Sequence, residues 1–170
     1  EEAITTSVVA GAIGLVIVIL FMIFAYRIPG LVAAIALILY TAIELITLNA
    51  FDITLTLPGI AGIILGIGMA VDANVIIYAR IREEIASGSS VRTAIKSGFS
   101  KAFSAIIDGN VTTLIAALVL MWMGSGTVKG FAYTLALGIV VSMFTALVVS
   151  RLIVNALYAV CLLYTSDAAD

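Results

Sequence analysis

The chain has 170 residues, of which 64% are hydrophobic and 11% charged, and its mean hydropathy of +1.29 is far above that of ordinary soluble domains. We therefore interpret it as a membrane protein. A formal net charge of -2 with no histidine excludes a basic nucleic-acid surface and any imidazole for metal binding or acid–base work. The single cysteine, Cys161, excludes a disulfide framework.

Five stretches with few or no charges are long enough to cross a bilayer, since about 20 apolar residues span ~30 Å of hydrocarbon at ~1.5 Å per residue. They predict an all-α integral membrane protein with spans at about residues 4–26, 29–50, 57–79, 102–123 and 130–152. The first stretch has no basic leader and follows Glu1-Glu2 rather than a methionine. We therefore expect a chain cut from a longer protein, whose true N-terminus is missing.

The lysines and arginines fall almost entirely on one side of these spans. If the spans alternate in direction, seven basic residues share that side: Arg27, Arg80, Arg82, Arg92, Lys96, Lys101 and Arg151. Only Lys129 falls on the other side, together with Glu1, Glu2 and Asp52. Because basic residues are enriched in cytoplasmic loops, we expect the amino end outside and the carboxyl end in the cytoplasm.

Two segments lie outside the predicted spans. The inner loop at about 80–101 carries Val91, Ile95, Phe99 and Phe103 at helical spacing, which is typical of an amphipathic surface helix but fits the entry into the fourth span equally well. Residues 161–170 neither continue the span pattern nor add basic residues. They resemble translated sequencing-adapter read-through, so we expect a non-native tail and leave it out of the functional reasoning.

Three carboxylates lie inside predicted spans, where each costs at least ~2.5 kcal/mol on insertion scales and is a functional candidate by default. Asp72 lies about four residues, or ~6 Å, to the cytoplasmic side of its span's midpoint. Asp108 lies about five residues to the same side of its own midpoint, so the two share a depth, which permits contact without requiring it. Glu44 lies to the outer side of its midpoint, and we expect it to snorkel outward rather than join them.

No lysine or arginine lies at the depth of Asp72 and Asp108 in these spans. Two alternatives follow: one or both carboxyls are protonated at rest, or a basic residue comes from a missing span or another subunit. Either arrangement suits reversible proton binding, so we predict a proton-coupling role for both residues. The structural alternative is a protonated Asp that only hydrogen-bonds to a neighbouring helix.

Small and polar residues accompany Asp72. Gly62 and Gly66 form a small-xxx-small pair that allows close helix approach, and Gly68 follows them. We expect these glycines to pack the helix at the centre of the bundle. Further polar side chains at compatible depths form an expected supporting cluster: Asn74, Asn110, Thr112, Thr113, Ser142 and Thr145. Serine and threonine in membrane helices also often bond to their own backbone, which is the alternative role.

Several motifs resemble those of one family. They are Gly66-Ile-Gly-Met-Ala-Val-Asp72-Ala-Asn74-Val running into Arg80-Ile-Arg82-Glu-Glu-Ile, then Asp108-Gly-Asn110-Val-Thr112-Thr113-Leu, Gly126-Thr-Val-Lys129-Gly-Phe-Ala, Ser142-Met-Phe-Thr145-Ala and Arg151-Leu-Ile-Val-Asn155. Together they resemble the SecD/SecF family of bacterial protein-export membrane proteins, and the SecD side of it more closely. The resemblance covers essentially residues 1–160.

The resemblance implies a resistance-nodulation-division (RND) type bundle of six spans, of which the first span and a large periplasmic domain are absent here. It implies a protein of the bacterial cytoplasmic membrane that works with SecF and the Sec channel. The proton-motive force would assist the outward movement of preproteins. The family's essential aspartate maps by motif onto Asp72, and its basic partner lies in SecF, which agrees with the lack of an intramembrane basic residue here.

The sequence carries no ATP motif, phosphate loop or nucleophile constellation. We therefore expect no enzyme activity, no cofactor and no bound metal, with protons as the coupling ion and the lipid bilayer as surroundings. Two other interpretations stay open. The chain is half of an RND-type small-molecule exporter, which the outer domain would distinguish, or it is a passive assembly subunit in which Asp72 serves only packing.

Overall fold

The computed structural model describes residues 2–167, with side chains described as far as residue 161. In this part of the chain the helices are α1 (Glu2–Tyr26), α2 (Ile28–Ala50), α3 (Leu57–Ala86), α4 (Val91–Met123), α5 (Thr127–Phe144) and α6 (Ser150–Asp167), and a π-helical turn at Thr145–Val149 joins α5 to α6. The helices α1 to α4 and the continuous run Thr127–Cys161 are each long and apolar enough to cross a membrane. The prediction of five long apolar helices is confirmed.

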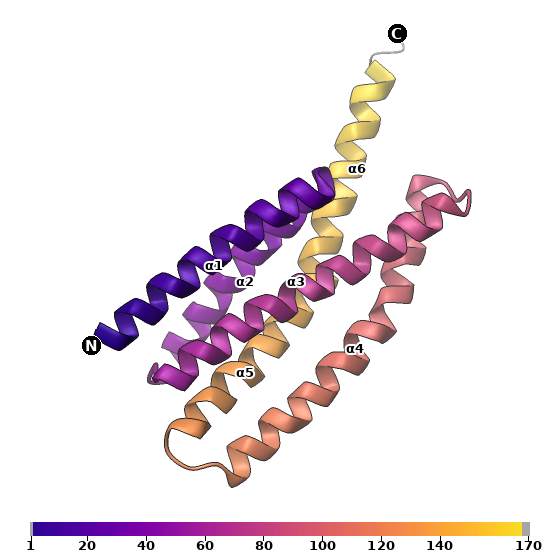
Figure 1. The fold of residues 1–170 in the computed structure, drawn as a ribbon. Coiled ribbons are helices and arrows are strands. Elements are labelled where there is room, and N and C mark those ends of the chain that lie inside the picture. Colours follow the sequence, from indigo (N-terminus) through magenta and orange to yellow (C-terminus); the bar gives the residue numbers. More distant parts are fainter. Residues whose placement is uncertain (1, 168–170) are drawn as a thin grey trace.

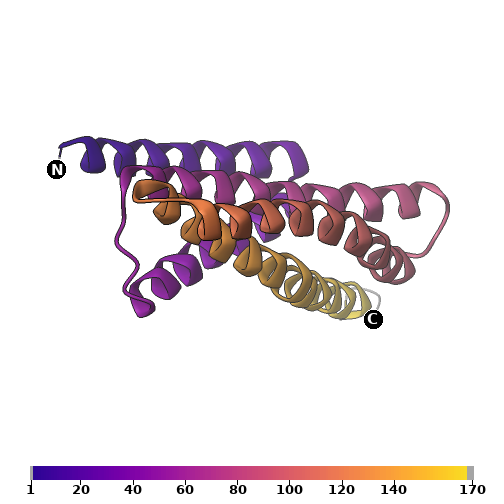
Figure 2. The ribbon, with the colours of Figure 1, turned by 90° about the horizontal axis from the view of Figure 1, so that it is seen from below.

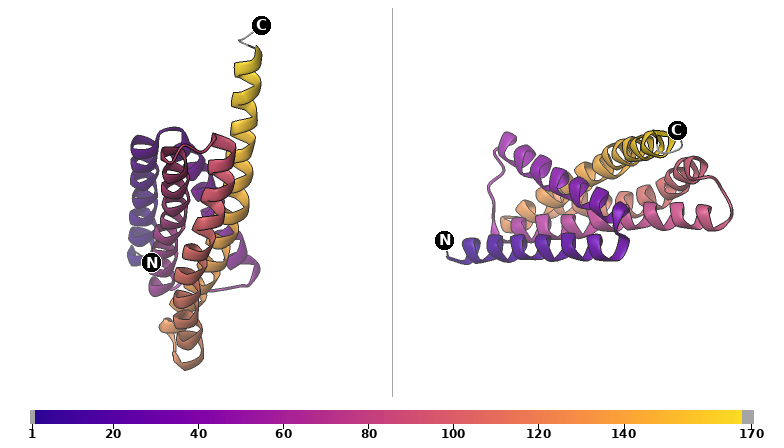
Figure 3. Two further views of the ribbon diagram at one scale, coloured as in Figure 1. Left: turned by 90° about the vertical axis from the view of Figure 1, so that its right-hand side faces the viewer. Right: turned by 90° about the horizontal axis from the view of Figure 1, so that it is seen from above.

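Helices α1 to α5 alternate in direction and form an elongated bundle, and α6 continues α5 in the same direction (Figure 1). Helix α3 is central, since it packs against α1, α2, α4 and α5. Helix α1 lies at one edge (Figure 2), and Met22 is its one buried residue among those described. Helix α6 extends beyond the other helices (Figure 3). The apolar outer surface, which includes Phe24 at 88% exposure, suits contact with lipid rather than water.

The two ends of the bundle differ in charge. One end holds the α1–α2 turn at Arg27, the α3–α4 hairpin and the start of α6 (Figure 1), and therefore seven of the eight lysines and arginines. We call it the basic end. The opposite end holds the α2–α3 loop at 51–56 and the α4–α5 turn at 124–126, next to Lys129. The spans therefore alternate in direction, as assumed in the sequence analysis, and the basic residues gather at one end as expected.

Local signals explain where the central helices begin. The Thr56 hydroxyl accepts a hydrogen bond of 3.2 Å from the Gly59 amide and caps α3. Ser90 does the same for α4, accepting 3.4 Å from the Thr93 amide. Side-chain caps of this kind satisfy backbone N–H groups that have no partner within the helix. The turn between α1 and α2 consists of Arg27 alone, which has a φ of 53°.

Residues 80–101 differ from the predicted amphipathic loop. Helix α3 continues to Ala86, a turn follows at 87–90, and α4 then runs without interruption from Val91 to Met123. The entry into the fourth span is therefore the interpretation that fits. The physical reason is that Ile95 and Phe99, the middle of the apolar line, are buried against Ile77 and Tyr78 of α3, while Val91 and Phe103 are exposed.

The last span is longer than the predicted range of 130–152. Helix begins at Thr127 and continues through the π-helical turn into α6 as far as Asp167. The predicted non-native tail at 161–170 falls largely outside the described residues, since side chains are described only to residue 161 and backbone only to residue 167.

Candidate functional site

Asp72 lies at a small groove between α3 and α4. The groove has a volume of about 180 Å³ and is lined by Met69, Asp72, Ala73, Ile76, Ala105, Ile106, Gly109 and Asn110. Small residues on α4 leave this space open beside the carboxylate. Asp72 itself is exposed on the outside of the bundle, so its carboxylate faces the surroundings of these five spans rather than their interior. We call this feature the Asp72 groove.

No cation pairs with Asp72 in the described part of the chain. The arginines that follow it on α3 are engaged elsewhere: Arg80 Nη1 lies 2.8 Å from Glu83 Oε2, and the Arg82 guanidinium lies 5.7 Å from the centroid of the Tyr26 ring. A carboxylate at membrane depth is costly without a partner. Asp72 therefore combines an exposed position, an adjacent small cavity and the lack of a counter-ion within these spans.

Asp108 does not join Asp72 in this groove. It is exposed and is not among the groove's lining residues, although its neighbours Gly109 and Asn110 are. The shared depth is thus not accompanied by a shared cavity, because Asp108 lies on a different side of α4. The proton-coupling role of either residue stays a prediction.

Asn74 makes the one buried side-chain hydrogen bond that links distant helices in the described structure. Its Oδ1 accepts 2.7 Å from the Ser150 hydroxyl at the start of α6, and its Nδ2 donates 3.1 Å to the Ala70 carbonyl. Both side chains are buried, at 2% and 0% exposure. The π-helical turn at Thr145–Val149 directly precedes Ser150, and such turns are frequent at functional sites.

Sequence reasoning missed Ser150 and the π-helical turn. Ser150 lies near the end of the predicted span at 130–152, next to Arg151, where a lone serine gives no signal. Nothing in the residues Thr-Ala-Leu-Val-Val at 145–149 distinguishes a π-helical turn from an α-helix. The contact with Asn74 depends on helices far apart in sequence, so only the structure reveals it.

Of the other members of the predicted polar cluster, Asn110 alone lines the Asp72 groove. It is buried and donates 2.8 Å to the Ile106 carbonyl. The hydroxyls of the remaining four residues donate to carbonyls of their own helices at 2.9–3.1 Å: Thr112, Thr113, Ser142 and Thr145. They adopt the alternative role of bonding to their own backbone.

The predicted glycine contacts fall into two groups. A Cβ at Gly62 would collide with the Thr134 hydroxyl of α5, and a Cβ at Gly66 would collide with the Tyr40 hydroxyl of α2. These two glycines therefore allow neighbouring helices to approach α3 closely. Gly68 differs from the expectation, because it is exposed and a Cβ there would meet nothing within 4 Å.

Glu44 is where the expectation is most clearly wrong. Instead of snorkelling outward, its side chain is turned into the bundle at 0% exposure, beside Tyr40, which is also at 0%. The carboxyl faces Gly138 of α5: a Cβ there would lie 2.9 Å from Glu44 Oε1 and 2.8 Å from the Tyr40 hydroxyl oxygen. Gly66 of α3 and Gly138 of α5 leave this space free. The position of Glu44 along α2 does not by itself reveal it.

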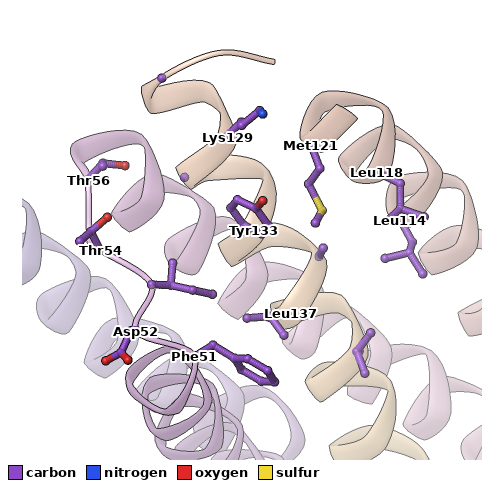
Figure 4. A pocket seen from close by; sticks show the side chains of 15 residues that line it. Phe51, Asp52, Thr54, Thr56, Leu114, Leu118, Met121, Lys129, Tyr133 and Leu137 are labelled. Carbon is purple, nitrogen blue, oxygen red and sulfur yellow. The ribbon is translucent and has the colours of Figure 1, made fainter. Parts of the chain in front are cut away.

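A larger pocket of about 820 Å³ lies at the opposite end of the bundle. Figure 4 shows it between α4, the α2–α3 loop and α5, with Tyr133 and Leu137 of α5 facing it. Its lining is mainly apolar, with Lys129 and Asp52 as its charged members. It shares no lining residue with the Asp72 groove.

These observations define a bundle of five long apolar helices with an exposed carboxylate over a small-residue groove. The family model described as "Protein export membrane protein SecD/SecF, C-terminal" matches residues 1–160. The chain belongs to this family, as its motifs predicted. Among its members the chain corresponds to the C-terminal membrane portion of SecD.

Individual relatives support this assignment. A protein translocase subunit SecD of Acidaminococcus fermentans is 57% identical over 157 residues, which make up 92% of this chain and 38% of that protein. A SecD of Synechocystis sp. is 56% identical over 151 residues, covering 89% of this chain and 32% of that protein. The chain thus spans about a third of the length of these relatives.

A solved structure has the same fold. The crystal structure of SecDF from Thermus thermophilus, described as a translocon-associated membrane protein, matches with a TM-score of 0.88 at 42% identity. The match covers 92% of this chain and 22% of that chain. The prediction of an all-α integral membrane protein is thereby confirmed.

Proposed function

We propose that this chain is the membrane portion of a SecD subunit that works with SecF to assist the outward movement of preproteins through the Sec channel, using the proton-motive force. In this proposal the protein acts as a transport component rather than an enzyme, needs no cofactor and uses protons as the coupling ion. The seven basic residues at the basic end support an orientation in the bacterial cytoplasmic membrane with that end, and the carboxyl terminus, in the cytoplasm.

The position of Asp72 carries the proposal. An exposed, unpaired carboxylate on a membrane-embedded helix is unfavourable against lipid, so its face requires cover by another element of the assembly. A basic side chain supplied there by SecF would form an ion pair that protonation of Asp72 breaks. Because Asp108 lies outside the Asp72 groove, we assign proton coupling to Asp72 alone.

Coupling requires two arrangements of the bundle that differ in affinity for the proton. Moving one charge through ~100 mV supplies about 2.3 kcal/mol, which is enough to shift the balance between two packings of similar free energy. The close contacts of Gly62 and Gly66 with neighbouring helices let α3 move without large side chains interlocking. Asn74, two residues after Asp72, bonds to Ser150, so a shift of α3 acts directly on α6.

The test is rescue of protein export in bacterial cells depleted of their native SecD. The complete subunit is supplied unchanged, with Asp72→Asn or with Asp52→Asn. Asparagine keeps the shape and hydrogen bonding of aspartate but does not ionise. Asp52 is a matched control because it lies in the α2–α3 loop at a φ of 51°, a conformation that asparagine tolerates. We expect export to fail only with Asp72→Asn, at normal levels of inserted subunit; full rescue by Asp72→Asn would favour the passive assembly subunit.

A further inference from the structure

The interior of the bundle holds a carboxyl and a phenol that the Asp72 mechanism does not use. Tyr40 and Glu44 are four residues apart on one face of α2 and are completely buried. In the described structure no other residue hydrogen-bonds the carboxyl oxygens of Glu44 or the Tyr40 hydroxyl, so these groups have only each other as partners. These oxygens meet in the space left by Gly138, where the Tyr40 hydroxyl and Glu44 Oε1 both lie within 3 Å of one Cβ position.

The elements packed around this pair bring no positive charge to it. Helix α1 has no charged residue between 3 and 26, and α3 has none between 57 and 71. The charge on α5 is Lys129, nine residues before Gly138 and therefore ~13 Å away along the helix. The π-helical turn has no charged residue, and Arg151 on α6 is exposed. Tyr40 is thus the one titratable neighbour of Glu44 among these groups.

An ionised carboxylate in this position would be buried without a cation or any N–H donor, which is among the costliest arrangements in a protein. A neutral carboxylic acid avoids that cost because it carries an O–H donor of its own. We propose that Glu44 and Tyr40 form a second proton-binding site, enclosed inside the bundle, in which Glu44 carries the proton.

The exchange of this proton breaks and re-forms one O–H bond on Glu44, and water is the acceptor and donor of the proton. In the protonated state the Glu44 O–H donates a hydrogen bond to the Tyr40 hydroxyl oxygen. When the proton leaves, Glu44 becomes a carboxylate and the Tyr40 O–H turns to donate to it, so the phenol stabilises both states. A four-residue spacing on one helix keeps the two groups adjacent throughout.

This site is separate from Asp72. Gly66, which faces the Tyr40 hydroxyl, precedes Asp72 by six residues, or ~9 Å along α3. The Glu44 site is closer to the end of the bundle that holds the α2–α3 loop, opposite the basic end. It is enclosed, whereas Asp72 is exposed. The inference deepens the proposed function, because it adds a second group that binds the coupling ion in the same bundle.

Infrared difference spectroscopy of the complete protein in phospholipid vesicles tests the inference, because a protonated carboxylic acid has a C=O stretching band that a carboxylate lacks. Glu44→Gln should remove one such band, and Tyr40→Phe should shift the same band by removing its hydrogen bond. Tyr133→Phe, at an exposed tyrosine of α5, should leave the band in place. If Glu44→Gln leaves every protonated-carboxyl band unchanged, Glu44 is ionised and the inference is wrong.

Two features keep this test independent of folding and of the proposed function. Tyr40→Phe deletes a single oxygen, so it reports on the site even where Glu44→Gln inserts poorly; an unshifted band would contradict the pairing of the two residues. The Glu44 band should persist in Asp72→Asn. Normal export with Asp72→Asn would overturn the proposed coupling, while the band at Glu44 would still decide this inference.

Discussion

The Ser150 hydroxyl donates a 2.7 Å hydrogen bond to Asn74 Oδ1 inside the bundle, joining the start of α6 to the helix that carries Asp72. Asp72 and Asn74 are two residues apart, so they lie on different sides of α3: one is exposed and the other is buried. Asp72, the proposed proton-binding residue, and Asn74, which connects α3 to α6, therefore lie on opposite sides of the same helix segment. Movement of α3 in response to Asp72 would reach α6 through this bond.

Removing this bond should destabilise the bundle. Ser150→Ala leaves Asn74 Oδ1 buried without a donor, and such a group costs ~1–3 kcal/mol. We expect a lower midpoint of unfolding in detergent than for the unchanged protein. Ser104→Ala, at an exposed serine of α4, is the control and should have no comparable effect. Equal midpoints for Ser150→Ala and the unchanged protein would contradict this prediction and mean that another donor, such as water, satisfies Asn74 Oδ1.

Glycines facing Tyr40 and Glu44 should not tolerate a methyl group. A Cβ at Gly138 would lie 2.8 Å from the Tyr40 hydroxyl and 2.9 Å from Glu44 Oε1, so Gly138→Ala should cost ~1–3 kcal/mol by overpacking. Gly68→Ala is the matched control, because a Cβ there meets nothing within 4 Å. Alanine is favoured over glycine in helices, so this control should unfold at the same midpoint or higher. A Gly138→Ala variant as stable as Gly68→Ala would contradict the packing.

The contact between Gly62 and Thr134 predicts energetic coupling. A Cβ at residue 62 would collide with the Thr134 hydroxyl and lie 3.1 Å from the Phe131 carbonyl oxygen, so Gly62→Ala should be destabilising. Thr134→Ala removes the colliding hydroxyl. The double variant should therefore be less destabilised than the sum of the single variants, by an interaction free energy of ~0.5–3 kcal/mol. Additive effects in a double-mutant cycle would show that the two helices separate instead.

The α3–α4 hairpin at the basic end should respond to pH through Glu84. Lys101 hydrogen-bonds Glu84 across the hairpin and thereby holds the pKa of that carboxyl below its usual value. A lowered folded-state pKa stabilises the hairpin above the usual pKa of glutamate, and this stabilisation is lost as the pH falls through the folded-state value.

The measurement compares unfolding midpoints at about pH 7 and about pH 3. Lys101→Met should lower the midpoint slightly at the higher pH and have little effect at the lower pH, since exposed ion pairs contribute modestly. Lys96→Met, at an exposed lysine without an ion pair in the described structure, should show no such pH dependence. An effect of Lys101→Met that is equal at both pH values would rule out the ion pair as its cause.

The helices were predictable because crossing hydrocarbon imposes a simple requirement on the chain: about 20 residues with few charges. The family was predictable because motifs such as the one around Asp72 are specific. The rotation of each helix about its axis was much less accessible. Gly62, Gly66 and Gly68 carry the same local signal, yet two of them contact neighbouring helices and the third faces outward, since that outcome depends on where the neighbouring helices lie.

Glu44 shows the same limit for polar groups. Its place near one end of α2 suggested an outward side chain, because long polar side chains reach water from such positions. The structure buries it where Gly66 and Gly138 from two other helices leave room for polar atoms. That space is formed by residues 22 and 94 positions away along the chain, and no pattern within α2 encodes it.

The most direct test of the central claim is the response of export to the proton gradient in membrane vesicles containing the complete subunit and SecF. Export of a preprotein is measured with the gradient intact and after an ionophore dissipates it. With unchanged subunit and with Asp52→Asn, we predict faster export when the gradient is present. With Asp72→Asn, the two rates should be equal. A gradient-dependent increase that survives Asp72→Asn would contradict the assignment of proton coupling to this residue.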